Sequence, residues 1–168
     1  ENKLYFDFYY RQFKFSLPVI KMYNHRHLFI VDGRTYDVRS VEAFRDLLKK
    51  LCDHTRKDEC LFIKKTYWSY DGNNIYKINA GHLNDAVFLN QLFLEITKSG
   101  YLFQETVNQH PVLNKFNPHC LNTIRLDTFM QRNGEVKIMS SYFKTNIKGA
   151  PVDNEPSGSC EIPLCLES

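Results

Sequence analysis

The dipeptide Asn133-Gly134, which lies between two runs of alternating side chains, is the feature that most constrains the fold of this chain. Asn-Gly between such runs is the strongest short-range signal for a β-hairpin, because both residues accept the positive φ angles of a type I′ turn. A two-residue turn here pairs Asp127 with Ser140. We therefore predict antiparallel strands over 121–130 and 136–143.

Strand geometry divides the side chains of this hairpin between two faces. One face is polar and contains Thr123, Arg125, Asp127, Ser140, Tyr142 and Lys144. The other is apolar, and we expect it to belong to a core; it contains Ile124, Leu126, Met130, Met139 and Phe143. Arg125 and Asp127 are consistent either with part of an anion site or with an ordinary ion pair, and the spacing alone leaves both interpretations open.

The rest of the chain predicts an α+β fold with mainly antiparallel sheets and packed helices. An Asp-Gly turn at 32–33 joins two short strands, and Ser40 begins an amphipathic helix. The other expected elements are strands at 60–65, 75–78 and 101–107 and a helix at about 84–98. Residues 1–26 begin with an aromatic-rich stretch that has no clean helical or strand period, so we treat them as a separate packing segment.

Charge and composition restrict the partners of the chain. The net charge is +3, from 22 basic and 19 acidic residues, and the pI of 8.6 is below the range typical of nucleic-acid-binding domains. We therefore expect no nucleic-acid partner. No apolar run approaches the ~20 residues that span a bilayer. The five cysteines form no Cys-x-x-Cys pair, which favours free thiols and a cytoplasmic protein.

Several strings in the second half resemble one family. They are the run from Gln104 to Pro111, the run from Leu121 to Arg125, and Val152-Asp153-Asn154 with Gly158 shortly after. Together they resemble the sugar-transfer-associated ATP-grasp family, over approximately 60–160. The Walker A and Rossmann glycine motifs are missing from the sequence, so the family resemblance carries the nucleotide prediction.

The resemblance implies an ATP-grasp-like α+β fold whose C-terminal part is incomplete in these 168 residues. Residues 27–103 would form the small N-terminal subdomain, and 104–168 would begin the C-terminal subdomain with its hinge, hairpin and loop. Such enzymes use ATP and Mg²⁺ to activate a carboxylate as an acyl phosphate, which is then transferred to an amine or similar nucleophile. The resemblance links the activity to polysaccharide or glycoconjugate biosynthesis.

The resemblance also assigns roles to particular residues. Lys64 would bind the α- and β-phosphates, and Arg125 and Lys144 would face the transferred phosphate as catalytic cations. Residues of the hinge would line the adenine, and a loop residue would lie near the phosphates; these are Gln104, Glu105, Val107 and Asn154. The metal ligands, the carboxylate and amine substrates and the oligomeric state are not specified by the sequence.

Two departures from the family pattern keep a second reading open. The stretch 66–74 has one glycine where relatives have a glycine-rich phosphate loop. The Glu-x-Asn element that holds magnesium in relatives would lie beyond residue 168. The alternative is therefore a non-catalytic binding or scaffold module that is derived from an ATP-grasp fold.

Overall fold

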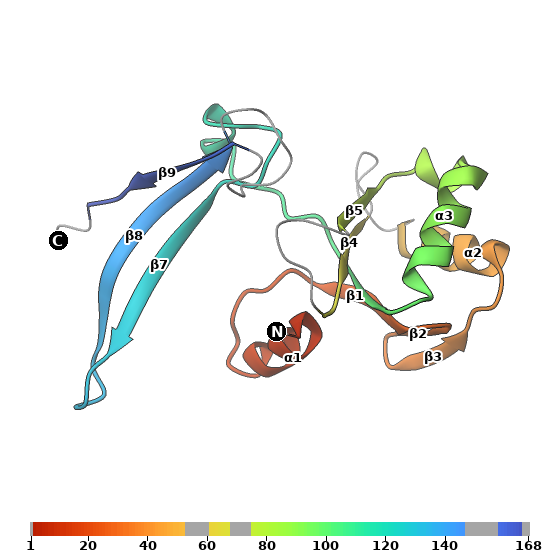
Figure 1. Cartoon of the computed structure of the whole chain (residues 1–168), viewed down its shortest axis with the longest axis horizontal. Coiled ribbons are helices and arrows are strands. Elements are labelled where there is room, and N and C mark those ends of the chain that lie inside the picture. The colour runs from red at the N-terminus through yellow and green to blue at the C-terminus, as the bar shows by residue number, and fades with distance from the viewer. Residues whose placement is uncertain (1, 53–60, 68–74, 147–157, 166–168) are drawn as a thin grey trace. The chain divides into compact units, whose positions relative to one another are not determined.

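The computed structural model describes residues 2–52, 61–67, 75–146 and 158–165 (Figure 1). The chain forms two compact units, 1–106 and 107–168. Within the described residues both units contain antiparallel sheets, and the helices longer than one turn belong to the first unit. The predicted α+β class with mainly antiparallel sheets is confirmed.

The described residues of the first unit form a six-stranded antiparallel sheet in the order β3-β2-β1-β6-β4-β5. Its strands are β1 (Ile20–His25), β2 (Leu28–Val31), β3 (Arg34–Asp37), β4 (Leu61–Lys65), β5 (Ile75–Ile78) and β6 (Gly100–Gln104). The N-terminal segment therefore supplies a central strand, because β1 pairs with both β2 and β6. The expected turn between β2 and β3 is present, with positive φ at Asp32 (47°) and Gly33 (75°) as a two-residue hairpin turn requires.

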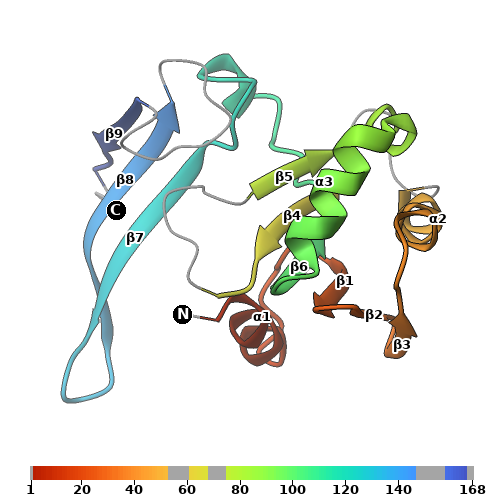
Figure 2. The same ribbon diagram turned by 45° about the vertical axis from the view of Figure 1, so that its right-hand side comes forward.

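Helices α2 (Val41–Cys52) and α3 (Ala86–Ile96) cover one face of this sheet (Figure 2). The Ser40 hydroxyl accepts a hydrogen bond from the Ala43 amide at 3.2 Å, so it caps α2 as predicted. Asp85 caps α3 in the same way by accepting from the Phe88 amide at 2.9 Å. A 3₁₀ turn, η1 (His82–Asn84), precedes α3.

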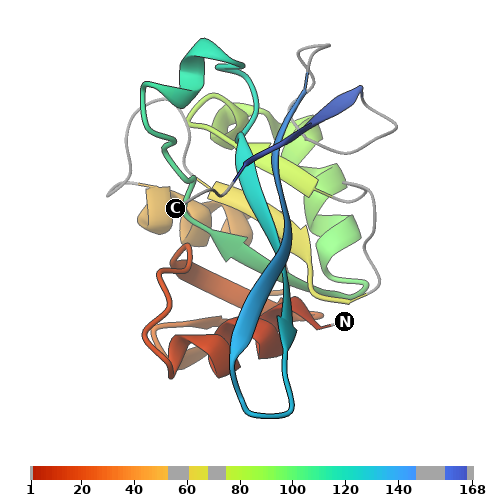
Figure 3. The ribbon, with the colours of Figure 1, turned by 90° about the vertical axis from the view of Figure 1, so that its left-hand side faces the viewer.

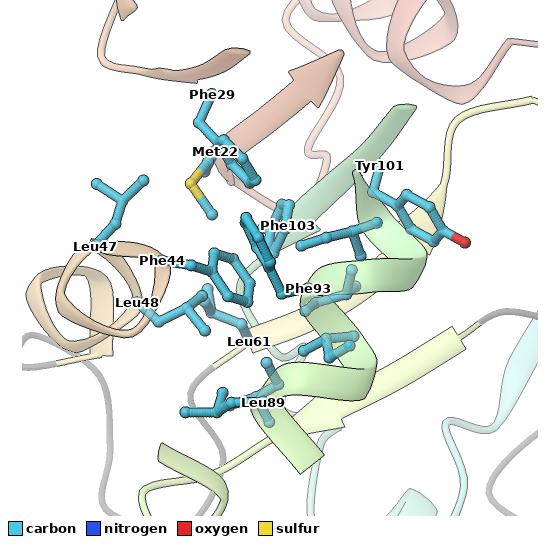
Figure 4. Close-up of a cluster of buried hydrophobic side chains, with 14 of the residues drawn as sticks. Met22, Phe29, Phe44, Leu47, Leu48, Leu61, Leu89, Phe93, Tyr101 and Phe103 are labelled. Carbon is cyan, nitrogen blue, oxygen red and sulfur yellow. The ribbon is translucent and has the colours of Figure 1, made fainter. Parts of the chain in front are cut away.

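The core of the first unit lies between these helices and the sheet (Figure 4). Phe44 of α2 is its centre, with ring centroids 5.6 Å from Phe29, 5.5 Å from Phe93 and 6.4 Å from Phe103. Complete burial of such side chains stabilises a fold by about 1.5–3 kcal/mol each. The amphipathic pattern of residues 41–51 predicted this contact, because Phe44, Leu47 and Leu48 share one stripe and are buried.

Helix α1 (Lys3–Arg11) lies on the opposite face of the sheet (Figure 2). The Phe8 and Tyr23 rings meet edge to face with centroids 5.7 Å apart, and the Lys3 amide donates to the Thr66 carbonyl at 3.0 Å. Leu102, which pairs with Tyr23, is buried on this second face. The aromatic-rich N-terminal residues thus include a helix that their sequence pattern did not show.

The second unit contains a three-stranded antiparallel sheet in the order β7-β8-β9 (Figure 3). Its elements are η2 (Leu113–Lys115), β7 (Thr123–Met130), β8 (Val136–Asn146) and β9 (Ser159–Pro163). The hairpin is present, but its turn differs from the predicted type I′. The Gln131 amide donates to the Glu135 carbonyl at 2.8 Å, which makes a three-residue loop with positive φ at Gly134 (86°).

A bulge restores the register that the longer loop would otherwise have shifted. The loop moves Phe129 opposite Lys137, and the irregularity between Asp127 and Thr128 moves the pairing back by one residue. Asp127 is therefore opposite Ser140, as predicted. The six predicted polar residues consequently share one face of the hairpin.

The prediction that the other hairpin face is core is wrong for most of its residues. Phe143 is buried, and its ring lies 4.8 Å from that of Phe116. The remaining predicted core residues are exposed: Ile124, Leu126, Met130 and Met139. An alternating pattern predicts which side chains share a face, but burial also needs a second layer, and no described element of the second unit supplies one here.

Candidate functional site

Lys64 lies on the face of the first sheet that is opposite α2 and α3. Its neighbours Leu61 and Ile63 belong to the core, so alternation along β4 places Phe62 and Lys64 on the second face. The Lys64 ammonium lies 4.9 Å from the centroid of the Phe62 ring, a cation–π distance. A strand position and an aromatic neighbour therefore fix where this cation points.

The environment of Lys64 disfavours its charge. Burial lowers the pKa of the Lys64 ammonium, and the positive charge of Lys3 lowers it further. Lys64 forms no ion pair with any carboxylate of the described residues. A half-buried cation without a counter-charge is expected to gain from a bound anion, because the anion replaces lost hydration and favours the charged form.

Gln104 shares this face with Lys64, as the pairing of β4 with β6 shows. Phe62 is opposite Gln104 and Lys64 is opposite Leu102. Gln104 is buried, and it lies one strand away from Lys64 and two residues along. We call this surface, defined by Phe62, Lys64, Leu102 and Gln104, the lysine face. It brings together two of the predicted nucleotide-binding residues.

Glu105 follows directly after β6 and is bound to the segment before β1. Its Oε1 accepts from the Val19 amide at 2.9 Å, and its own amide donates to the Val19 carbonyl at 2.9 Å. Its Oε2 also lies 3.9 Å from Lys21 Nζ. Glu105 therefore fixes the end of β6 against the segment that precedes β1.

Arg125 and Lys144 lie on the polar face of the hairpin in the second unit. Thr123 is opposite Lys144 and Arg125 is opposite Tyr142, so the two cations are diagonal neighbours on adjacent strands. Arg125 is 61% exposed, and its Nε lies 3.3 Å from Asp127 Oδ1. Lys144 is only 18% exposed, and its Nζ lies 2.8 Å from Glu161 Oε1. The structure thus shows the ion pair that the sequence left as an alternative.

Asp127 is the most strongly bound carboxylate of this face. Its Oδ2 accepts from the Tyr142 hydroxyl at 2.5 Å and from the Ser140 hydroxyl at 2.8 Å. These bonds, and to a lesser extent Arg125, hold the pKa of Asp127 below its ordinary value. Asp127 therefore stays ionised and orients Arg125 through Nε, which leaves the two terminal nitrogens of the guanidinium for a ligand.

The predicted residues form two groups, one in each unit. Lys64, Gln104 and Glu105 belong to the first unit, and Arg125 and Lys144 belong to the second. Val107, the first residue of the second unit, is exposed. Asn154 and most of the 66–74 loop lie outside the described residues.

The second unit contains a cluster of hydrogen-bonded amide side chains that the sequence analysis did not predict. Gln109 Oε1 accepts from the Asn122 amide at 3.0 Å and from Asn122 Nδ2 at 2.9 Å. Asn122 Oδ1 accepts from Thr145, and Asn117 donates to the Asn146 carbonyl. Two of the strings behind the family resemblance, around Gln109 and around Asn122, thus meet in this cluster, which joins the loop before β7 to the end of β8.

The described residues contain no group of three or more His, Cys, Asp or Glu side chains that could hold a metal ion. We derive no step through a metal. None of the described helices is long and apolar enough to cross a membrane. Neither family models, nor curated proteins, nor solved structures gave a match to the chain.

Proposed function

We propose that this chain is the ATP-binding region of an ATP-grasp-type ligase that acts in polysaccharide or glycoconjugate biosynthesis. The observation that carries the proposal is Lys64, a half-buried lysine with a lowered pKa and no carboxylate partner among the described residues. It shares a strand-defined face with Gln104, and the string around Asn122 lies beside the hairpin that presents Arg125. These placements agree with the roles that the family resemblance implies.

Each unit presents a cation that is suited to phosphate oxygens. Lys64 is a point charge on a rigid strand, which suits the α- and β-phosphates. Arg125 is a planar donor oriented by Asp127, which suits the oxygens of the transferred phosphate as charge develops on them. Lys144 adds a second cation whose charge is partly balanced by Glu161.

Adenine binding is assigned to the end of β6. Phe62 is a partly exposed apolar side chain of the lysine face, and it lies beside the buried Leu102 and Gln104. The backbone of 105–107 would provide the hydrogen bonds to the base edge. When the protein acts as a ligase, ATP would transfer its γ-phosphoryl group to a carboxylate, and an amine or similar nucleophile would then displace the phosphate.

Isothermal titration calorimetry of the whole chain with ATP tests this proposal. We expect saturable binding that Lys64→Ala and Arg125→Ala each weaken by about tenfold or more, because hydrogen bonds to charged groups contribute about 1.5–3 kcal/mol. Lys137→Ala is the matched control, since Lys137 is an exposed cation of the same hairpin. Binding that is lost equally in all three variants, or no binding at millimolar ATP, would refute the proposal.

The second candidate is a non-catalytic binding or scaffold module that is derived from the same fold. The exposed apolar face of the β7–β8 hairpin and the ion-paired states of Arg125 and Lys144 favour it. Such a module would bind its partner unchanged after Lys64→Ala. Any ATP-dependent turnover that this substitution abolishes would exclude it.

A further inference from the structure

Helix α1 buries a charged side chain and exposes aromatic ones, which is the reverse of an ordinary surface helix. Asp7 is only 4% exposed, and its carboxylate accepts two hydrogen bonds from Arg11, from Nε at 2.9 Å and from Nη2 at 2.8 Å. Aromatic side chains of the same segment point to solvent, with Tyr5 65% and Phe13 60% exposed. A surface helix normally buries its apolar stripe and exposes its charges. The reversed arrangement indicates that the outer surface of α1 meets something other than water.

The exposed rings of residues 5–15, five of which are joined by ring contacts, are called here the aromatic patch. It contains Tyr5, Phe6, Phe8, Tyr9, Tyr10, Phe13 and Phe15. Ring centroids are 4.4 Å apart for Phe6 and Tyr10, and 5.2 Å apart for Tyr9 and Phe13. The rings thus hold one another in place before any partner binds, so little conformational entropy is lost on docking.

The charges around the aromatic patch are positive. Residues 2–16 contain three cations, Lys3, Arg11 and Lys14, and one carboxylate, Asp7. That carboxylate is buried and paired with Arg11, so the two charges offset each other and the excess positive charge of the segment comes from Lys3 and Lys14. The complementary partner is therefore apolar at its centre and anionic at its edge.

This charge distribution discriminates between the partners that an aromatic surface fits. A second copy of the chain would place the same positive charges against each other, which is unfavourable. An anionic lipid bilayer matches both features, because Tyr and Phe are favoured at the membrane interface and Lys and Arg bind its anionic headgroups. A bilayer also accepts a convex helix without a matching groove.

We propose that α1 and the turn after it dock the protein on a bilayer surface that carries anionic headgroups. The phenyl rings enter the boundary of the acyl chains, and the tyrosine hydroxyls and the cations lie at the level of the headgroups. The docking is peripheral and involves no spanning helix. This proposal does not depend on the ATP-binding proposal, because it rests on residues 2–16 alone.

Co-sedimentation of the whole chain with vesicles tests the docking. One set contains only phosphatidylcholine, and the other also contains phosphatidylserine. We expect at least about tenfold tighter binding to the anionic vesicles, with a loss at high salt, since each cation contributes about fivefold. The double substitution Phe6→Ser with Phe13→Ser should weaken this binding by about tenfold or more.

Phe129→Ser is the matched control, because Phe129 is 56% exposed and lies in the second unit. Lys14→Glu tests the charge without touching a ring, and it should weaken binding by about 20-fold. Circular dichroism melts check that each variant is folded. Three results would overturn the proposal: no sedimentation with anionic vesicles, equal sedimentation of the double variant and the Phe129→Ser control, or a lipid-free dimer that the double substitution dissociates.

Discussion

Replacing Asn122 by alanine tests whether the buried amide cluster holds the second unit together. The Asn122 side chain donates through Nδ2 to Gln109 at 2.9 Å and to the Leu113 carbonyl at 3.0 Å. Its Oδ1 accepts from the Thr145 hydroxyl. Alanine would leave the buried Thr145 hydroxyl without this acceptor, whereas the Leu113 carbonyl would still accept from the Phe116 amide at 3.1 Å.

An unsatisfied buried polar group costs about 1–3 kcal/mol. With one such group, we expect Asn122→Ala to lower the free energy of unfolding by about 2 kcal/mol. Hydrogen exchange measures this locally, and the protection of the β8 amides near Thr145 should fall by about 30-fold.

Asn133→Ala is the matched control for this experiment. Asn133 also forms two side-chain hydrogen bonds, but both are made to Glu135 at the exposed turn. Its substitution should change the unfolding free energy by less than about 0.5 kcal/mol. If Asn122→Ala costs no more than Asn133→Ala, the cluster does not stabilise the second unit and this reasoning is wrong.

Three further predictions concern the first unit. Phe44→Ala should lower the free energy of unfolding by about 3–5 kcal/mol in a urea titration, because Phe44 lies at the centre of the ring cluster; a loss below about 1 kcal/mol would contradict this. Gly100→Ala should destabilise by about 1–3 kcal/mol, since the added Cβ would lie 2.8 Å from Thr66 Oγ1; an unchanged melting temperature would contradict it. The lowered pKa of Lys64 means that the unfolded chain binds this proton more tightly, so wild-type stability should rise relative to Lys64→Met between the lowered pKa and 10.5; parallel pH profiles in urea unfolding would contradict the burial of this cation.

Local sequence patterns were sufficient where one short-range rule decides the structure. Positive φ at Asp32 and Gly33 makes the tight turn that an Asp-Gly pair predicts. Asn133-Gly134 contains the same signal, but there only Gly134 has positive φ and the loop has three residues. The faces of the hairpin were nevertheless predicted correctly, because the bulge beside Asp127 compensates for the longer loop.

Features that depend on distant parts of the chain could not be predicted from those patterns. Helix α1 was missed because its buried residue is the charged Asp7 and most of its aromatic rings are exposed, so the period of its aromatic residues does not mark the contact with the sheet. The contact between Gln109 and Asn122 joins two loops that no local period connects. The half-burial of Lys64 depends on its place in β4 and on Lys3, which is 61 positions earlier in the sequence.

The candidate site was predicted in part for the same reason. Strand alternation alone is enough to place Arg125 and Lys144 on one polar face. It could not show that both cations have a carboxylate partner, because Glu161, the partner of Lys144, belongs to β9, a strand that the local patterns did not predict. The sequence analysis considered the pair of Arg125 with Asp127, but it did not predict the support that Asp127 receives from Tyr142.

The central claim is the proposal that Lys64 binds ATP. A titration of the isotope-labelled chain with ATP, followed by two-dimensional NMR of the backbone amides, tests it most directly. We expect the amides around Lys64 in β4 to shift along a saturation curve, and Lys64→Ala should remove that saturation. No saturable shift around Lys64, or the same shifts in Lys64→Ala as in the wild-type chain, would contradict the claim.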